Sequence, residues 1–215
     1  MTTRRFALAA LTTVALVTVA VAGGQTFHVN DPAGRNVVTF TSEAPLEDIV
    51  GTTNQITGWV EFDPMNPDNG GKAMLSVPVA SLDTGIPLRD EHLRSAAWLN
   101  AEANPEIQLN VVEIKDVEKV KSGDGFHTFD VTVAADFMLN GKTKRMEVPG
   151  RVTYLAESDQ TKALMPGDLL AVRAEFPVTL ADFGVTGPEG KEIVGSKVGE
   201  TVTVDVSFRA TNAEG

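Results

Sequence analysis

The stretch from Ser81 to Asn100, SLDTGIPLRDEHLRSAAWLN, gathers the side chains that could carry out acid–base chemistry. His92 is one of only three histidines in the chain, and Asp90 lies two residues before it. A carboxylate that orients an imidazole is a common arrangement for general acid–base catalysis, and a nearby serine could complete a hydrolytic triad. The stretch therefore raises the hypothesis that Asp90 and His92 act as an acid–base pair.

Helix chemistry offers a simpler explanation of the same charges. Apolar residues at helical spacing predict a short helical segment near residues 88–99, which Pro105 would keep from continuing. Asp90 would lie in the first turn, where unpaired N–H groups and the helix dipole favour a carboxylate. Arg94 follows four residues later, at the spacing of a helical ion pair. The sequence also has no Gly-x-Ser-x-Gly elbow, so we predict a scaffold here and keep catalysis by His92 as the alternative.

Metal and cofactor binding are not indicated by the residue types. The chain has no cysteine, which excludes disulfides, thiolate zinc sites and cysteine nucleophiles. The three histidines, His28, His92 and His127, are far apart and show no paired spacing of the kind that zinc ligands have. No glycine-rich loop has the context of a phosphate cradle. We therefore predict neither a metal nor a cofactor.

The charge balance narrows the class of partner. The chain has 18 basic and 29 acidic residues and a formal net charge of −11. A phosphate backbone requires a positive surface, so the composition argues against a nucleic-acid partner. It argues equally against electrostatic docking on anionic membranes.

The N-terminus has the three-part layout of a secretory signal. Two arginines precede an apolar run, and small residues surround a cleavage point after Ala22. The run is short for a membrane anchor and is rich in alanine and threonine. We predict a signal peptide over residues 1–22 and a single mature domain over residues 23–215. The mature protein would be periplasmic or secreted, without stable membrane insertion.

The rest of the chain alternates between apolar and polar residues. Residues 129–139 place Phe, Val, Val, Ala, Phe and Leu on one face, with polar residues such as Thr and Asp between them. This period of two predicts a strand with one buried face. Asn140 and Gly141 follow at once, and this pair is a strong hairpin signal because both residues tolerate positive φ.

Similar patterns recur along the chain and predict about eight strands. The apolar face switches between Val111 and Val112, as a β-bulge would cause. Pro149 and Gly150 suggest a bulge or a sheet edge within another strand. Short connections with turn residues favour an antiparallel sandwich or barrel, and long strands with one apolar face favour the barrel. Alternation alone leaves open whether the interior is packed or hollow.

The residues then resemble a known family, the YceI-like family of lipocalin-like, polyisoprenoid-binding proteins. The most specific segment combines Ser81–Gly85 (SLDTG), Arg89, Asp90, His92–Ser95 (HLRS), Leu99, Pro105 and Ile107. Further similar segments are ITGWVEFDP at 56–64, LNGKTK at 139–144 and LADFGVTG at 180–187. Where the family commonly has histidine and serine near its first strands, this chain has Arg35, Asn36 and Glu43, and Leu109 stands where the family tends to have phenylalanine.

The resemblance implies an all-β fold, an extended antiparallel lipocalin-like barrel whose apolar tunnel takes an isoprenoid or similar lipid chain. It also implies a periplasmic protein that forms a homodimer. The inward positions that we expect to line the tunnel are Phe62, Leu75, Val77, Phe129, Val131, Val133, Phe137, Phe176, Val204 and Val206. The leading hypothesis is a non-enzymatic lipid carrier, store or sink. One alternative is an envelope enzyme that acts on a small lipid or quinone through His92 and Asp90, and another is a structural module with a dry core.

Overall fold

The computed structural model describes residues 24–213, so the predicted signal peptide at 1–22 lies outside the described residues. The strands are β1 (Gln25–Val29), β2 (Val37–Glu43), β3 (Asp48–Thr53), β4 (Thr57–Phe62), β5 (Gly71–Pro78), β6 (Glu106–Gly123), β7 (Phe126–Leu139), β8 (Lys142–Leu155), β9 (Leu169–Thr179) and β10 (Thr201–Thr211). The helices are α1 (Pro87–Arg94) and α2 (Asp159–Lys162), with 3-10 turns η1 (Pro67–Asn69), η2 (Val79–Ser81) and η3 (Leu180–Phe183).

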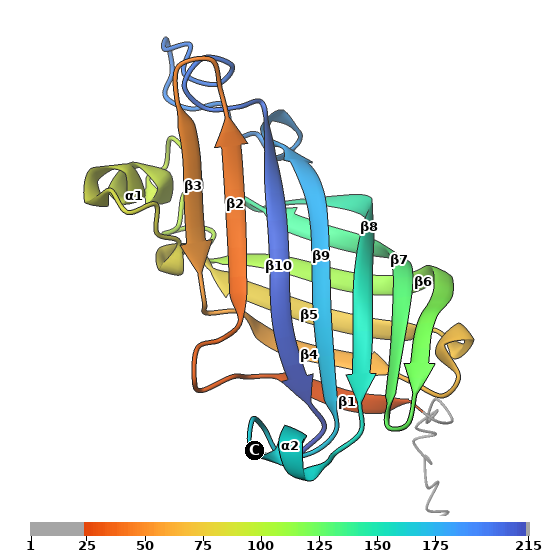
Figure 1. Cartoon of the computed structure of the whole chain (residues 1–215). Helices are drawn as coiled ribbons and strands as arrows, with labels where there is room; N and C mark the ends of the chain where they lie inside the picture. The colour runs from red at the N-terminus through yellow and green to blue at the C-terminus, as the bar shows by residue number, and fades with distance from the viewer. Residues whose placement is uncertain (1–23, 214–215) are drawn as a thin grey trace, which may run out of the picture.

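The strands form an antiparallel barrel with an added hairpin (Figure 1). Eight strands close a ring in the order β1-β4-β5-β6-β7-β8-β9-β10, because His28 of β1 pairs with Thr211 at the end of β10. The first half of β10, Val202–Ser207, pairs along the same edge with β2 instead of β1. β2 pairs in turn with β3, and these two strands form the added hairpin. The predicted barrel of about eight strands is therefore confirmed.

The barrel is tight at one end and splayed at the other. β8 pairs with β9 only from Gly150 to Leu155, while its first half, up to Pro149, pairs with β7 alone among the described strands. Pro149 thus lies at the edge position that its missing N–H predicts. The turn η3 lies beside this gap, where the Asn140 side-chain amide donates to the Phe183 carbonyl over 3.2 Å.

Local signals in the sequence are realised where they were expected. Asn140 and Gly141 have φ values of 50° and 70°, as the β7–β8 hairpin turn requires. The register of β6 against β7 shifts between Val111 and Glu113, which confirms the predicted bulge. Helix α1 (Pro87–Arg94) begins one residue before the helical segment predicted near residues 88–99 and ends about halfway through it, and turns continue to residue 103.

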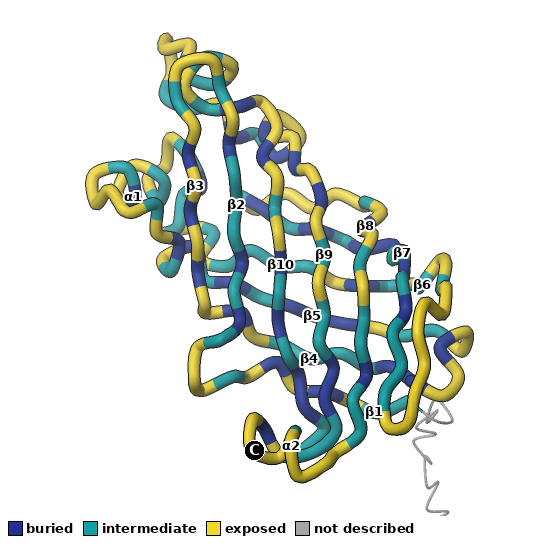
Figure 2. Tube along the Cα trace, in the orientation of Figure 1, coloured by how far each residue is buried: buried dark blue, intermediate teal, exposed yellow. Residues whose placement is uncertain are grey.

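Burial follows the strand period (Figure 2). Along β3, for example, exposed and buried residues alternate strictly. At the tight end the interior is filled by side chains such as Phe27 and Phe129, both 0% exposed. Phe129 meets Phe62 edge to face, with ring centroids 5.8 Å apart. This end of the barrel is a packed core.

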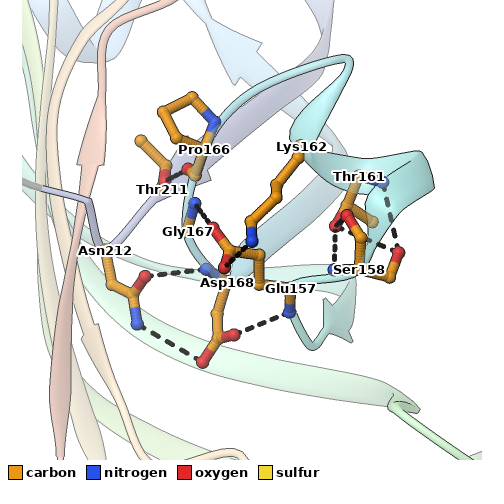
Figure 3. A network of polar contacts seen from close by, with 9 residues as sticks. All are labelled: Glu157, Ser158, Thr161, Lys162, Pro166, Gly167, Asp168, Thr211 and Asn212. Atoms are coloured by element: carbon orange, nitrogen blue, oxygen red, sulfur yellow. Dashed lines mark hydrogen bonds and ion pairs between the residues drawn. The ribbon is translucent and has the colours of Figure 1, made fainter.

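A polar network holds the loop that covers the tight end (Figure 3). The Asp168 carboxylate accepts hydrogen bonds from the Tyr154 phenol over 2.9 Å and from the Glu157 N–H over 2.8 Å. Asn212, just after β10, accepts from the Asp168 N–H over 2.8 Å. The network joins β8, the α2 loop and the end of β10, and so fixes the cover over the core.

No helix among residues 24–213 has the length and apolarity needed to cross a bilayer.

Candidate functional site

The splayed end of the barrel encloses a cavity of about 620 Å³. This volume is within the range of small-molecule sites, roughly 300–1,000 Å³. One wall comes from β2, β9 and β10, and its residues are Val38, Phe40, Phe176, Val178, Val202, Val204 and Val206. The facing wall comes from β5, β6 and β7, and its residues are Leu75, Val77, Ile107, Leu109, Phe137 and Leu139. The interior that alternation left open is therefore hollow at this end and packed at the other.

Six of the ten residues expected to line a tunnel lie on the cavity wall: Leu75, Val77, Phe137, Phe176, Val204 and Val206. The other four, Phe62, Phe129, Val131 and Val133, belong to the packed part of the barrel. All ten face inward, as the strand period requires, but the period carries no information about height along the barrel axis. That these residues bind a ligand stays a prediction.

Two phenylalanines of the cavity wall, Phe137 and Phe176, belong to an aromatic cluster with Phe183 of the core. The ring of Phe137 meets Phe176 edge to face at 5.8 Å between centroids, and meets Phe183 of η3 at 5.5 Å. The next inward residues toward the tight end, Ala135 on β7 and Ala174 on β9, do not line the cavity. The cavity thus ends before the packed core, at the level of Val38 and Val206.

The segment containing α1 lies beside β3 (Figure 1), and several of its residues line one side of the cavity. Asp83 and Thr52 of β3 exchange two backbone hydrogen bonds, of 3.0 and 2.8 Å, so the segment is attached along the outer hairpin. Arg89 forms an ion pair with Glu47 at the start of β3. Leu93 and the buried Leu99 pack against the core cluster and also line the cavity. The family-like segment therefore forms part of the pocket.

Asp90 and His92 differ in burial and in their hydrogen-bond partners. Asp90 is buried and accepts hydrogen bonds from the Thr84 N–H over 2.9 Å and from the Thr84 hydroxyl over 2.6 Å. Burial opposes ionisation, but these hydrogen bonds outweigh it and hold the pKa of Asp90 below its usual value. His92 is exposed at the cavity mouth. Within residues 24–213 no hydrogen bond joins Asp90 to His92, so Asp90 braces the turn before α1.

The expected ion pair between Asp90 and Arg94 is absent from the described residues, where no carboxylate lies within 4.0 Å of Arg94. Arg94 instead donates from Nη2 to the Leu82 carbonyl over 3.1 Å. Ser95 donates to the His92 carbonyl over 2.7 Å and not to its imidazole. The side chains of Arg94 and Ser95 thus form hydrogen bonds within the segment itself.

Sequence reasoning missed the loop at 184–199, which covers the other side of the mouth. Val185, Ile193 and Val198 line the cavity from this loop. They stand among glycines and charged residues with no period, so neither a helical nor a strand pattern identifies them. The β2 residues Val38 and Phe40 were also missed, although their alternation in the stretch NVVTFTS was a usable signal. In the described part of the chain, no three metal-ligating side chains gather at one point.

Comparison with known proteins identifies the family. The model of the YceI-like domain matches residues 29–210. This chain belongs to the YceI-like family. A UPF0312 protein of Serratia proteamaculans is 29% identical over 148 residues, which cover 67% of this chain and 69% of that protein. Protein YceI of Escherichia coli is 28% identical over a stretch of the same length, with the same coverage of both chains.

Solved structures share the fold of this YceI-like chain at low sequence identity. Burkholderia cenocepacia BcnA has a TM-score of 0.63 and 21% identity, covering 85% of this chain and 99% of that one. A polyisoprenoid binding domain from Saccharophagus degradans has a TM-score of 0.59 and 13% identity, covering 87% and 98% of the two chains. The Campylobacter jejuni YCEI protein has a TM-score of 0.59 and 14% identity, covering 80% and 90%. These likenesses show a shared fold.

Proposed function

We propose that this protein is a non-enzymatic binding protein that holds an isoprenoid or similar amphiphilic lipid in the cavity of its splayed end. The observation that carries the proposal is the cavity itself, about 620 Å³ in volume and walled by aliphatic and aromatic side chains from seven strands. Burial of apolar surface contributes about 25 cal/mol per Å², so a hydrocarbon chain is the ligand that such walls favour. The structural neighbour described as a polyisoprenoid binding domain supports an isoprenoid in particular.

The proposed location is the periplasm or the cell exterior. The N-terminal residues 1–22 have the layout of a cleavable signal, and the domain would begin after them. In an aqueous compartment of this kind, a lipid chain needs a carrier because its exposed apolar surface is unfavourable. Transport, storage and sequestration are the roles that an apolar pocket of this kind would serve.

We assign no acid–base role to the pair Asp90 and His92. Asp90 is already engaged by two hydrogen bonds from Thr84, and His92 lies at the mouth without that carboxylate as a partner. A catalytic Asp–His pair requires the carboxylate to accept a hydrogen bond from the imidazole that it orients, and this contact is not formed between Asp90 and His92 in residues 24–213. Substitution of His92→Ala should therefore leave the fold and lipid uptake in place.

The direct test is extraction of the purified mature protein with organic solvent, followed by mass spectrometry. The expected result is a co-purified lipid with a long hydrocarbon chain. The proposal predicts further that Val204→Phe will reduce the amount of lipid, because Val204 lines the cavity between its neighbours Phe40 and Phe176. A lipid-free protein that also fails to take up geranylgeraniol would contradict the proposal.

The matched control for Val204→Phe is Val50→Phe on β3. Both substitutions add the same side chain to a strand, but Val50 is 52% exposed and does not line the cavity. Lipid content should be unchanged in Val50→Phe. If both variants retained equal lipid, the ligand would have to be outside the cavity.

A further inference from the structure

The net charge of the residues on the cavity wall is opposite in sign to the net charge of the whole protein. Acidic residues outnumber basic ones by 29 to 18 in the chain. On the cavity wall the order is reversed, with Arg89, Lys191 and Lys197 against the single acid Glu47. Arg89 and Glu47 form an ion pair and neutralise each other. Two lysines therefore remain to set the charge of the mouth.

A folded loop positions both lysines. Lys191 and Lys197 stand on the 184–199 loop, which lies against the turn between β2 and β3 (Figure 1). The loop is closed on itself by backbone hydrogen bonds, including one of 2.7 Å from the Gly195 N–H to the Val198 carbonyl. It is also anchored to the barrel, where the Gly199 N–H donates to the Ser42 hydroxyl over 2.8 Å. The lysines are thus presented by a scaffold and not by a free chain.

The positive charge of these lysines is not used within the protein. Within residues 24–213, neither Lys191 nor Lys197 has a carboxylate within 4.0 Å. Glu189 and Glu192 belong to the same loop but do not line the cavity. An apolar pocket that opens through two unpaired ammonium groups is complementary to an anionic amphiphile.

We propose that Lys191 and Lys197 bind the anionic head group, a phosphate or carboxylate, of the lipid whose chain fills the cavity. This inference rests on the proposed lipid-binding function and adds the chemical class of the ligand to it. Hydrogen bonds from an ammonium group to an anion are about twice as strong as neutral ones, and Lys binds phosphate as a point charge. The lysines are exposed, so salt screens the interaction and the affinity falls as ionic strength rises.

The test compares three probes by isothermal titration calorimetry on the mature protein: farnesyl diphosphate, farnesol and inorganic pyrophosphate. Farnesyl diphosphate should bind about tenfold more tightly than farnesol, the effect of roughly one charge-assisted hydrogen bond. The double variant Lys191→Gln, Lys197→Gln should lose about that factor for the diphosphate and keep its affinity for farnesol. Added salt should weaken diphosphate binding alone.

The matched control is the double variant Lys119→Gln, Lys121→Gln on β6, which removes the same charge from residues that do not line the cavity. This variant should bind all three probes as the unaltered protein does. Equal binding of farnesol and farnesyl diphosphate by the unaltered protein would overturn the head-group inference and leave the lipid-binding function standing. Pyrophosphate that binds as tightly as the diphosphate would replace the inference with a free-anion site. Failure of both isoprenoids to bind would overturn the lipid-binding function itself.

Discussion

The Tyr154 phenol donates a hydrogen bond of 2.9 Å to the Asp168 carboxylate, and this contact closes the tight end of the barrel. Tyr154 comes from β8 and is buried, whereas Asp168 immediately precedes β9. The His127 ring on β7 stacks on the phenol, with ring centroids 6.2 Å apart. One contact thus links a buried aromatic side chain to the polar network beneath the barrel.

The first prediction concerns the ionisation of Tyr154. Burial, together with the hydrogen bond to Asp168 and its negative charge, raises the pKa of the phenol from 10.0 to about 12. The folded-state value exceeds the unfolded one, so the contribution to stability is fully present below about pH 10 and is lost as the pH rises toward 12. Tyr154 is the only tyrosine in the chain, so ultraviolet absorbance reports it directly.

The control for this titration is Asp168→Asn, followed by circular dichroism at each pH. Removal of the carboxylate charge should lower the pKa of Tyr154 toward its ordinary value. A midpoint near pH 10 in the unaltered protein, while it is still folded, would contradict the buried hydrogen bond.

The second prediction concerns acid stability at Asp31. The Arg35 guanidinium donates to the Asp31 carboxylate over 2.7 and 2.8 Å, and the Ala33 and Arg35 N–H groups also donate to it. The hydrogen bonds from Arg35 outweigh burial and lower the pKa of Asp31 from 3.8 to about 2. Because the folded-state pKa is depressed, this contribution to stability is present above about pH 4 and is lost as the pH falls toward 2.

Urea unfolding at several pH values checks the Asp31 prediction. Asp31→Asn should lower the free energy of unfolding by about 1–3 kcal/mol at pH 7. The gap between the variant and the unaltered protein should narrow as the pH falls toward 2. A gap that stays constant from pH 7 to pH 2 would contradict the assignment.

The third prediction separates the packed end from the hollow end. Phe129 is 0% exposed in the packed core, so Phe129→Ala should lower the free energy of unfolding by about 3–5 kcal/mol. Phe176→Ala should cost less, because Phe176 already borders the cavity and fewer contacts are lost. Denaturant unfolding of lipid-free protein measures both. Equal costs would indicate that the cavity is filled by side chains in solution.

The fourth prediction concerns a close approach of two strands. Gly58 on β4 has a φ of 140°, and a Cβ there would lie 1.9 Å from the Met74 carbonyl oxygen on β5. Gly58→Ala should therefore destabilise the protein by more than about 2 kcal/mol, because both the backbone and the neighbouring strand must shift. Gly70 is the matched control, since its φ of 89° is also positive but nothing lies within 4 Å of its Cβ position.

Thermal unfolding of the two glycine variants gives the comparison. Gly70→Ala should cost less than Gly58→Ala, about 1–3 kcal/mol, because the backbone at Gly70 (φ 89°, ψ −177°) lies in a region that only glycine adopts readily but no neighbouring atom has to move. Similar losses in both variants would mean that β4 and β5 are not as close as the register places them.

The sequence by itself determined the strand faces, the hairpin and the bulge. These features depend on neighbours along the chain: Asn140 and Gly141 set the turn, and the switch at Val111 set the bulge. The family-like segment around His92 likewise identified the fold, because its residue types stand at a specific spacing. None of these required knowledge of which distant strands would pair.

Only the tertiary structure decided where the barrel is hollow. Phe129 and Phe137 lie on the same face of β7, yet one is in the packed core and the other lines the cavity. Phe129 lies opposite Val152 of β8, where β8 pairs with β9, whereas Phe137 lies opposite Lys144, where that pairing has ended. The position of the 184–199 loop at the cavity could not be predicted from the sequence for the same reason. The loop is held there by contacts with residues about 150 positions away, such as Ser42. Pairing partners distant in sequence fix both features, and a local pattern carries no information about them.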